Sequence, residues 1–239
     1  MQGYPQKKFF HNFTNEKIDI KEISKYWISS QKEIITNKKY KFLKTHNANF
    51  KINNNFFTTS EVTAGAIYIV RDPRDVVCRA STHFDLSVEE TKNILFDRYG
   101  QTMARIENPN EMTTFLGSWS DNLNYWLNFN KNILLIKYED LVLKKKDTIL
   151  KILDYLNLFF PINISQQKLD TCLRTTSFKN VVSLEEQGKF GESVKSKDFK
   201  KIRFFNKGIV GGWRDVIDKK VAREIEFKFK KEMISLGYL

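Results

Sequence analysis

The feature that most constrains the fold is a set of three short apolar runs, each followed at once by charged and polar residues. The runs cover residues 40–43, 66–70 and 133–136, and the polar clusters follow at 44–46, 71–75 and 137–140. Continuous apolar runs of this length are typical of strands buried on both faces of a parallel sheet. Ligands bind just beyond the carboxyl ends of such strands. The sequence therefore predicts an α/β fold with a binding crevice at these strand ends.

Helical periodicity elsewhere completes the predicted architecture. Residues 115–129 and 141–156 repeat apolar side chains at helical spacing, and a long helix is expected over 216–235. The aromatic stripe from Trp119 to Trp126 is interpreted as core packing in preference to a substrate platform. We expect a single domain over residues 1–239, with a parallel central sheet flanked by helices in three layers and a mobile, lid-like loop at 187–201. One face of the last helix is expected to be lined by Val221, Ile225, Phe229 and Met233.

Composition and charge limit the classes of function. With 41% hydrophobic residues, 10 Gly and 4 Pro, the chain is not a disordered or low-complexity protein. No apolar run approaches the ~20 residues of a membrane span, and residues 1–8 lack the apolar core of a signal peptide, so we expect a cytoplasmic protein. The net charge of +12 favours anionic partners, unless the basic residues only keep the surface soluble. Two cysteines are too few for a disulfide framework or a zinc site, and no metal is expected.

Residues 66–84 are the most informative segment. The expected strand delivers Arg71 at its tip, and Pro73 suits the first turn of the helix that follows. A guanidinium there offers a planar fork to phosphate oxygens beside the amides of a helix start. Arg79 lies two helical turns further on and can join the same anion site. Alternatively, arginine–aspartate pairs within residues 71–75 only tie the strand end to its neighbours, and the spacing leaves both interpretations open.

The same segment, AIYIVRDPRDVVCRASTHF, resembles the 3′-phosphate-binding motif of the sulfotransferases that use 3′-phosphoadenosine 5′-phosphosulfate (PAPS). Four further segments match that family in the same order. Residues 42–46 (FLKTH) resemble the strand that ends in its catalytic lysine and histidine, and residues 138–140 (YED) resemble the strand end whose tyrosine meets adenine. Residues 176–179 (TSFK) resemble its TSFK segment, and residues 204–213 resemble its RKGxxGxW loop. The chain is thus identified as a member of the cytosolic-type family, which implies a P-loop-NTPase-like sulfotransferase fold.

The resemblance implies transfer of a sulfuryl group from PAPS to a hydroxyl, or less often an amine, of a small molecule, lipid or sugar. His46 would accept the proton of the acceptor, and Lys44 would stabilise charge on the bridging oxygen. Arg71 would hold the 3′-phosphate, and Tyr138 would contact the adenine. The full set of cofactor-binding residues that the resemblance implies is Arg71, Arg79, Tyr138, Thr176, Ser177, Phe178, Phe204, Asn206, Lys207 and Gly208.

The chain departs from the family pattern in several places. Arg79 stands where the family usually has serine, and Asn206 stands where it has arginine, which is either a compensating exchange or a decayed pocket. The family's dimerisation signature has no counterpart after Trp213, so an oligomeric state is not transferable. Nothing matches the opening strand and its YPKSGTTW loop, and Tyr4 and Pro5 share only its first letters. We therefore expect the fold to lack its first strand and loop. Three explanations are possible: the start of the reading frame was assigned too late, the chain is truly truncated, or it is a degenerate homologue. The otherwise intact motifs favour the first explanation.

Two other classes of function remain as alternatives. One is a non-catalytic relative that at most binds adenosine 3′,5′-bisphosphate (PAP); the lack of the opening loop supports it, and the retained lysines, histidine and arginine speak against it. The other is a nucleic-acid-binding protein, suggested by the charge and the aromatic residues. No basic arm or nucleic-acid motif accompanies them, so we expect no nucleic-acid partner.

Overall fold

The computed structural model describes residues 2–13, 20–36, 40–102, 112–129, 132–190, 194–195, 201–205 and 208–239. The chain divides into two compact units. The first comprises Met1–Tyr68 and Ile94–Ile133, and the second comprises Ile69–Asn93 and Leu134–Leu239. Both units are made of two separate stretches of chain, so neither corresponds to a continuous piece of sequence. The single domain expected from the sequence stays a prediction.

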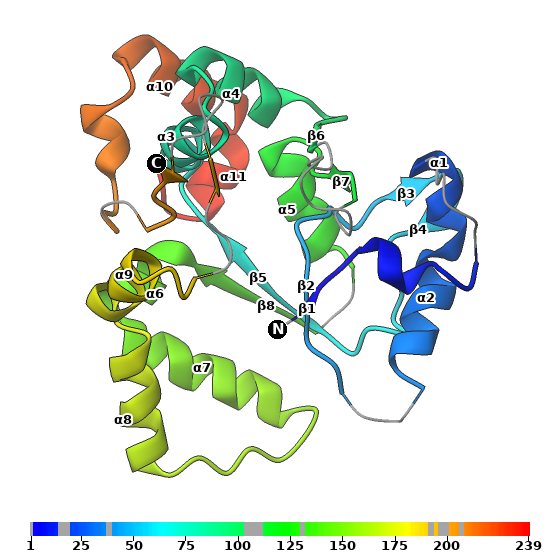
Figure 1. The fold of residues 1–239 in the computed structure, drawn as a ribbon. Coiled ribbons are helices and arrows are strands. Elements are labelled where there is room, and N and C mark those ends of the chain that lie inside the picture. The colour runs from blue at the N-terminus through cyan, green and yellow to red at the C-terminus, as the bar shows by residue number, and fades with distance from the viewer. Residues whose placement is uncertain are drawn as a thin grey trace. The chain divides into compact units, whose positions relative to one another are not determined.

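The two best-predicted strands pair with each other. β5 (Ala66–Val70) and β8 (Ile133–Lys137) are neighbours in one sheet (Figure 1). The amide of Ala66 donates to the carbonyl of Asn132 at 3.1 Å, so the strands start side by side and run in the same direction. Both strands lie where the sequence predicts them, although Ile69 is 54% exposed and β5 is therefore not buried on both faces.

The prediction for the first strand is wrong at its start. Tyr40 and Phe42 are exposed, and β2 covers only Leu43–Lys44. It pairs in parallel with β1 (Gln2–Gly3), with Gly3 opposite Lys44. No strand was expected at the start of the chain, because nothing there matches the opening strand and loop of the family; β1 is only two residues long. Within the described residues the strands form five two-stranded pieces instead of the single central sheet that we expected.

The first unit is built around an aromatic core. Tyr4, Phe10, Trp27, Phe57 and Trp126 belong to one buried cluster. The Tyr4 hydroxyl donates to the carbonyl of Trp27 at 3.0 Å and lies 2.8 Å from the Ser30 hydroxyl. Burial raises the pKa of Tyr4 to about 12. The other elements of this unit are η1 (Lys7–Phe9), α1 (Ile20–Ile23), η2 (Ser24–Tyr26), α2 (Trp27–Ile34), β3 (Lys51–Ile52), β4 (Asn55–Phe56), β6 (Gln101–Thr102), β7 (Thr114–Phe115) and α5 (Trp119–Leu127).

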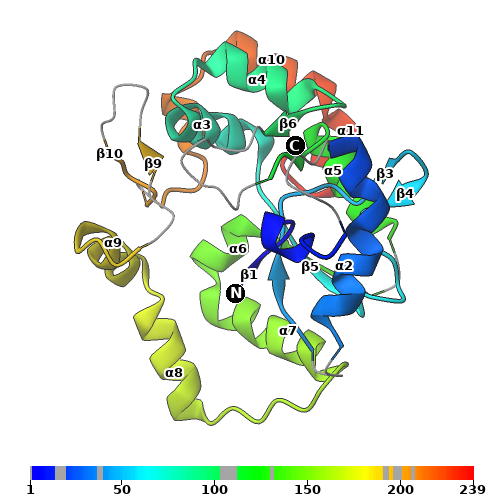
Figure 2. The same cartoon turned by 45° about the vertical axis from the view of Figure 1, so that its right-hand side comes forward.

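The second unit is mainly helical. Its helices are α3 (Pro73–Phe84), most of α4 (Val88–Phe96), α6 (Tyr138–Leu143), α7 (Lys145–Asn157), α8 (Gln166–Thr175), α9 (Phe178–Glu186), η3 (Gly212–Asp215), α10 (Lys219–Lys228) and α11 (Lys230–Ser235). Figure 2 shows α4 beside α10. The helix predicted over 141–156 is divided into α6 and α7, and the one predicted over 216–235 into α10 and α11.

The burial pattern supports the predicted helix faces. Val221, Ile225, Phe229 and Met233 are all buried. Trp119 and Trp126 are buried as well, which confirms the core interpretation of the aromatic stripe. In the stretch predicted to be irregular, a short antiparallel pair joins β9 (Val194–Lys195) to β10 (Lys201–Ile202), and residues 191–193 and 196–200 lie outside the described residues. Among the helices that the structure describes, none combines the length and apolarity that crossing a bilayer requires.

The hydroxyl of Tyr4 provides a test of the core of the first unit. Replacing Tyr4 by Phe keeps the ring but removes a buried donor and leaves the Trp27 carbonyl with one partner fewer. We expect Tyr4→Phe to lower the free energy of unfolding by about 1 kcal/mol, measured by urea denaturation. The control is Tyr99→Phe, because the Tyr99 side chain is almost fully exposed. An equal effect of the two substitutions would contradict the role given to the Tyr4 hydroxyl.

Candidate functional site

The junction between β5 and α3 is set by two carboxylates. Asp72 is the N-cap of α3, where its side chain accepts the amide of Arg74 at 2.9 Å and Pro73 occupies the first turn. The amide of Asp72 in turn donates to Glu139 at the start of α6, at 3.0 Å. The other oxygen of Glu139 accepts the hydroxyl of Tyr238 at 2.8 Å. The end of β5 is therefore tied to both α6 and the end of the chain.

Arg74 is a structural residue. Its guanidinium binds both oxygens of Asp72, donates to Glu226 of α10, and donates to the carbonyl of Tyr238 at 2.9 Å. Its charge also lies over the ring of Trp213, with 4.2 Å between the guanidinium carbon and the ring centroid. Every face of this buried side chain is thus in use. For Arg74, the alternative that an arginine–aspartate pair ties the strand end to its surroundings is the one observed.

Arg71 is held differently. Its guanidinium carbon lies 4.3 Å from the centroid of the Tyr138 ring, and its contacts to oxygen are long: 3.4 Å to the carbonyl of Ile209 and 3.7 Å to Asp75. Asp75 is engaged more closely elsewhere, because it accepts the amides of Gly211 at 2.8 Å and Trp213 at 2.9 Å. The structure therefore brings together Arg71 and Tyr138, two residues of the predicted cofactor site.

Arg79 is the most unusual of the predicted cofactor residues. One of its terminal nitrogens, Nη2, donates to the carbonyls of Phe204 at 2.7 Å and Arg203 at 3.4 Å. The other, Nη1, is buried and has no hydrogen-bond partner among the described residues. Burial lowers the pKa of Arg79, and the charge of Arg71 lowers it further. A buried donor beside a second cation is the chemistry of an anion site.

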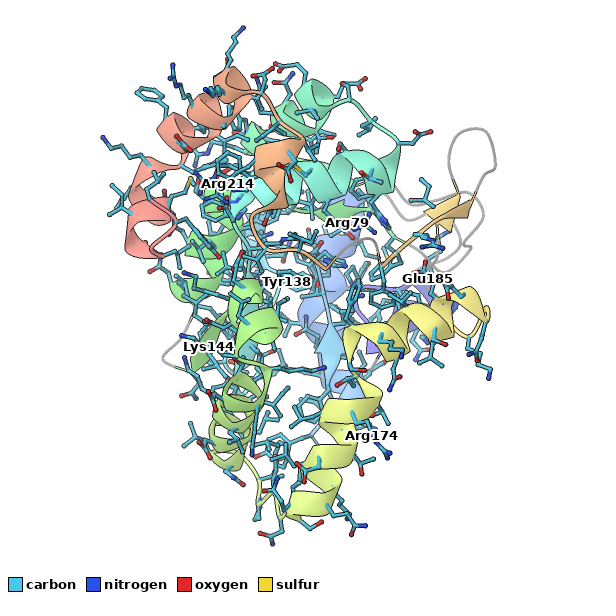
Figure 3. The ribbon with its side chains drawn as sticks, turned by 90° about the vertical axis from the view of Figure 1, so that its left-hand side faces the viewer. Arg79, Tyr138, Lys144, Arg174, Glu185 and Arg214 are labelled. Carbon is cyan, nitrogen blue, oxygen red and sulfur yellow. The ribbon has the colours of Figure 1, made fainter. Side chains whose placement is uncertain are left out.

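The negative charge of Glu185 partly offsets the effect of Arg71 on the pKa of Arg79. It is only 3% exposed, and its two oxygens accept the amides of Phe204 and Phe205, the second at 2.8 Å. Residues 203–205 are thus held through their amides by a carboxylate and through their carbonyls by the Arg79 guanidinium. Figure 3 labels Arg79 on α3, Tyr138 at the start of α6 and Glu185 on α9. Sequence reasoning missed Glu185, because nothing in the sequence separates it from its neighbour Glu186.

The remaining predicted cofactor residues are only partly brought together. The hydroxyl of Thr176 donates to the carbonyl of Cys172 at 2.6 Å, and Ser177 is the N-cap of α9. Both hydroxyls therefore serve local helix ends. The side chain of Lys145, which we did not single out, donates to the carbonyl of Thr176. Phe178 packs against Gly208, where an added Cβ would lie 2.7 Å from the Phe178 ring. Asn206 and Lys207 lie outside the described residues.

The predicted catalytic pair belongs to the first unit. Lys44 ends β2 and is partly buried, and the side chain of His46 is exposed. The backbone after β2 is anchored firmly: Trp126 donates its ring N–H to the carbonyl of Asn47 at 2.9 Å, and Asn122 donates to the carbonyls of Leu116 at 2.7 Å and His46 at 3.4 Å. The stripe on α5 therefore also fixes the chain at His46. From the sequence, Trp126 could be predicted only as a core residue, and its hydrogen bond to the backbone could not be predicted.

Within the described residues, no group of three or more His, Cys, Asp or Glu side chains is arranged to hold a metal ion. The two cysteines, Cys78 and Cys172, are unpaired. The chemistry of the described site is that of arginine, lysine, histidine and aromatic side chains.

Comparisons with known proteins identify the family. The family model of the sulfotransferase domain matches residues 7–237, so this chain belongs to the sulfotransferase family. Members of this family are typically PAPS-dependent enzymes. Over 177 residues it is 27% identical to cytosolic sulfotransferase 12 of Arabidopsis thaliana, a match that covers 69% of this chain and 49% of the relative. Over 172 residues it is 27% identical to sulfotransferase 2A1 of Rattus norvegicus, covering 71% and 57%. The chain thus spans about half the length of these curated relatives.

Solved structures support the fold. A mouse sulfotransferase, SULT7A1 complexed with PAP, superimposes with a TM-score of 0.59 at 20% identity, covering 86% of this chain and 71% of that protein. Retinol dehydratase in complex with androsterone and PAP superimposes with a TM-score of 0.57 at 18% identity, covering 82% and 53%. The chain therefore has a sulfotransferase fold, which combines helices with a small parallel sheet.

Glu185 gives a test of the site that needs no ligand. We expect Glu185→Gln to lower the protection of the Phe204 and Phe205 amides against hydrogen exchange by about tenfold or more, because bonds to a charged acceptor contribute roughly 1.5–3 kcal/mol. The measurement is amide hydrogen exchange followed by NMR or mass spectrometry.

The matched control is Glu186→Gln. Glu186 is exposed and pairs with Arg203 at 3.3 Å on the surface, so its loss should change protection less than about twofold. Equal protection in the two variants would show that Glu185 does not hold this segment.

Proposed function

We propose that this chain is a cytoplasmic enzyme that transfers a sulfuryl group from PAPS to a hydroxyl, or less often an amine, of a small molecule, lipid or sugar. Family membership supports the reaction class, and the residues of the second unit support the donor. The observation that carries the proposal is the arrangement of Arg71 and Arg79. Both guanidinium groups are partly buried, the charge of one lowers the pKa of the other, and Nη1 of Arg79 is an unused buried donor.

These residues fit an adenosine nucleotide with a 3′-phosphate. A phosphate dianion would relieve the repulsion between Arg71 and Arg79 and would accept from Nη1 of Arg79. Tyr138, stacked on the Arg71 guanidinium, offers an aromatic surface for adenine in the same part of the second unit. Thr176, Ser177 and Phe178 would line the adenine side. The segment from Phe204 to Gly208 would close over the phosphate.

PAPS, when bound, supplies the sulfuryl group and a bisphosphate leaving group. His46 acts as the general base that removes the proton from the acceptor, a role suited to an imidazole near neutral pH. Lys44 stabilises negative charge on the leaving oxygen through its ammonium group. Asn122 and Trp126 donate to the carbonyls of His46 and Asn47 and so limit the movement of the backbone at His46. No step in this scheme calls for a metal ion.

The donor site is tested by titrating the chain with PAP in a calorimeter. We expect the wild type to bind and Arg71→Ala to bind at least tenfold more weakly, because a charge-assisted contact to phosphate contributes roughly 1.5–3 kcal/mol. Arg223→Ala is the matched control, since Arg223 is exposed on α10 and should not affect binding. A folded wild-type chain that does not bind PAP would contradict the proposed donor.

Substitution of Arg79 distinguishes the two explanations of its departure from the family pattern, a compensating exchange and a decayed pocket. If Arg79 supplies a phosphate contact, Arg79→Ser weakens PAP binding by about the same factor as Arg71→Ala. A serine variant with unchanged affinity would instead indicate that the arginine does not compensate for the replacement at Asn206.

The catalytic role of His46 is tested by transfer of radiolabelled sulfuryl from PAPS to a panel of phenol, steroid-alcohol and sugar acceptors. We expect His46→Ala to lower kcat by roughly a hundredfold to ten-thousandfold, the range typical of a lost general base, with PAP affinity unchanged. His11→Ala is the control, because His11 is an exposed histidine of the same unit. Retained transfer by His46→Ala would exclude His46 as the base, and PAP binding without transfer would favour the non-catalytic alternative.

A further inference from the structure

The outward face of the two C-terminal helices carries basic and apolar side chains together. At about 100° per residue, the positions opposite the buried stripe of α10 are 219, 220, 223 and 227. The hydrogen bonds from Phe229 to the carbonyl of Ile225 at 3.0 Å and from Met233 to the carbonyl of Phe229 at 2.9 Å carry the helical repeat from α10 into α11. The same face therefore continues through positions 230, 231 and 234. We call it the C-terminal basic face, and its exposed residues are Lys219, Lys220, Arg223, Phe227, Lys230, Lys231 and Ile234.

The acidic residues of α10 do not neutralise this face. Glu224 pairs with Lys92 of α4, and Glu226 pairs with Arg74 of α3. Both carboxylates are thus turned toward basic partners that lie beneath the helix. Arg223, in the middle of the outward face, forms no ion pair with a residue that the structure describes. The outward face consequently keeps its positive charge.

Two large apolar side chains are exposed among these cations. Phe227 is 86% exposed and Ile234 is 54% exposed. They are seven residues apart, which places them two helical turns apart on one face. A single exposed apolar residue needs no explanation, but two on one stripe that also carries five cations form a combined apolar and basic surface.

We propose that the C-terminal basic face binds the surface of an anionic lipid bilayer. The lysines and Arg223 meet lipid phosphates, while Phe227 and Ile234 enter the boundary between head groups and acyl chains. Single-stranded nucleic acid would also attract the cations and stack on Phe227, but it gives Ile234 no partner. The inference is independent of the proposed transferase reaction, because none of these residues belongs to the donor or catalytic site.

The test is co-sedimentation of the full chain with sucrose-loaded vesicles of phosphatidylcholine, with and without phosphatidylserine. We expect binding that requires phosphatidylserine and weakens as salt is raised. Lys220→Glu/Arg223→Glu should weaken it by at least tenfold, since each basic residue near an anionic surface contributes about a fivefold factor. Phe227→Ser/Ile234→Ser should weaken it by several-fold without changing the net charge.

Two controls make the result specific. Lys146→Glu/Lys151→Glu changes the net charge by the same amount at two exposed positions of α7, and this variant should lose no more than a few-fold in vesicle binding. Circular dichroism of every variant checks that the helices are retained. A parallel titration with a single-stranded oligonucleotide tests the other anionic partner.

Four outcomes would overturn the proposal. They are a wild-type chain that does not bind phosphatidylserine vesicles, equal losses in the α7 and α10 charge variants, unchanged binding by Phe227→Ser/Ile234→Ser, and oligonucleotide binding that is tighter than vesicle binding and sensitive to the same α10 substitutions. Vesicle binding that depends on both the α10 charges and the two apolar side chains would support it.

Discussion

The second unit depends on buried carboxylates whose partners come from distant parts of the chain. Asp75, at 2% exposure, accepts two amides from the segment before and within η3, and Glu139 accepts both the amide of Asp72 and the hydroxyl of Tyr238. A charge removed from water is tolerated only when it is paired and fully hydrogen-bonded. The segments that meet at the end of β5 are therefore fixed together, because displacing any one of them would leave a buried charge without its partner.

This arrangement gives two nearby arginines opposite roles. Arg74 forms ion pairs with Asp72 and Glu226 and donates to the carbonyl of Tyr238, so its charge is neutralised by groups of the protein. The closest bonds of Asp75 go to backbone amides, so that its oxygen lies 3.7 Å from Arg71. The charge of Arg71 lowers the pKa of Arg79, and the carboxylate of Glu185 acts on it in the opposite direction. The result is a pair of neighbouring arginines beside backbone segments whose amides are bound by buried carboxylates.

The main strands and the start of α3 could be predicted from the sequence, whereas the roles of individual site residues depended on tertiary contacts. The strands at 66–70 and 133–137 were predictable because their apolar runs are unambiguous, and Asp72-Pro73 marks a helix start in any context. The exposure of Tyr40 was not predictable, since an apolar run does not say which of its residues a neighbour covers. Glu185 and Glu186 are equivalent in the sequence, and only the packing of α9 against residues 203–205 buries one and exposes the other. The sequence likewise left open which arginine of residues 71–75 is structural, because that is decided by Glu226, more than 150 positions away.

The contact between Gly208 and Phe178 has a consequence for how this loop can evolve. Gly208 has a φ of +60°, and any Cβ there would meet the Phe178 ring. The two positions lie thirty residues apart in the sequence, yet position 208 cannot change alone: a larger residue there requires a smaller one at 178 and a different backbone conformation. In relatives that share this contact, an aromatic ring at 178 should therefore be accompanied by glycine at 208, whereas loss of the ring would leave position 208 freer to vary.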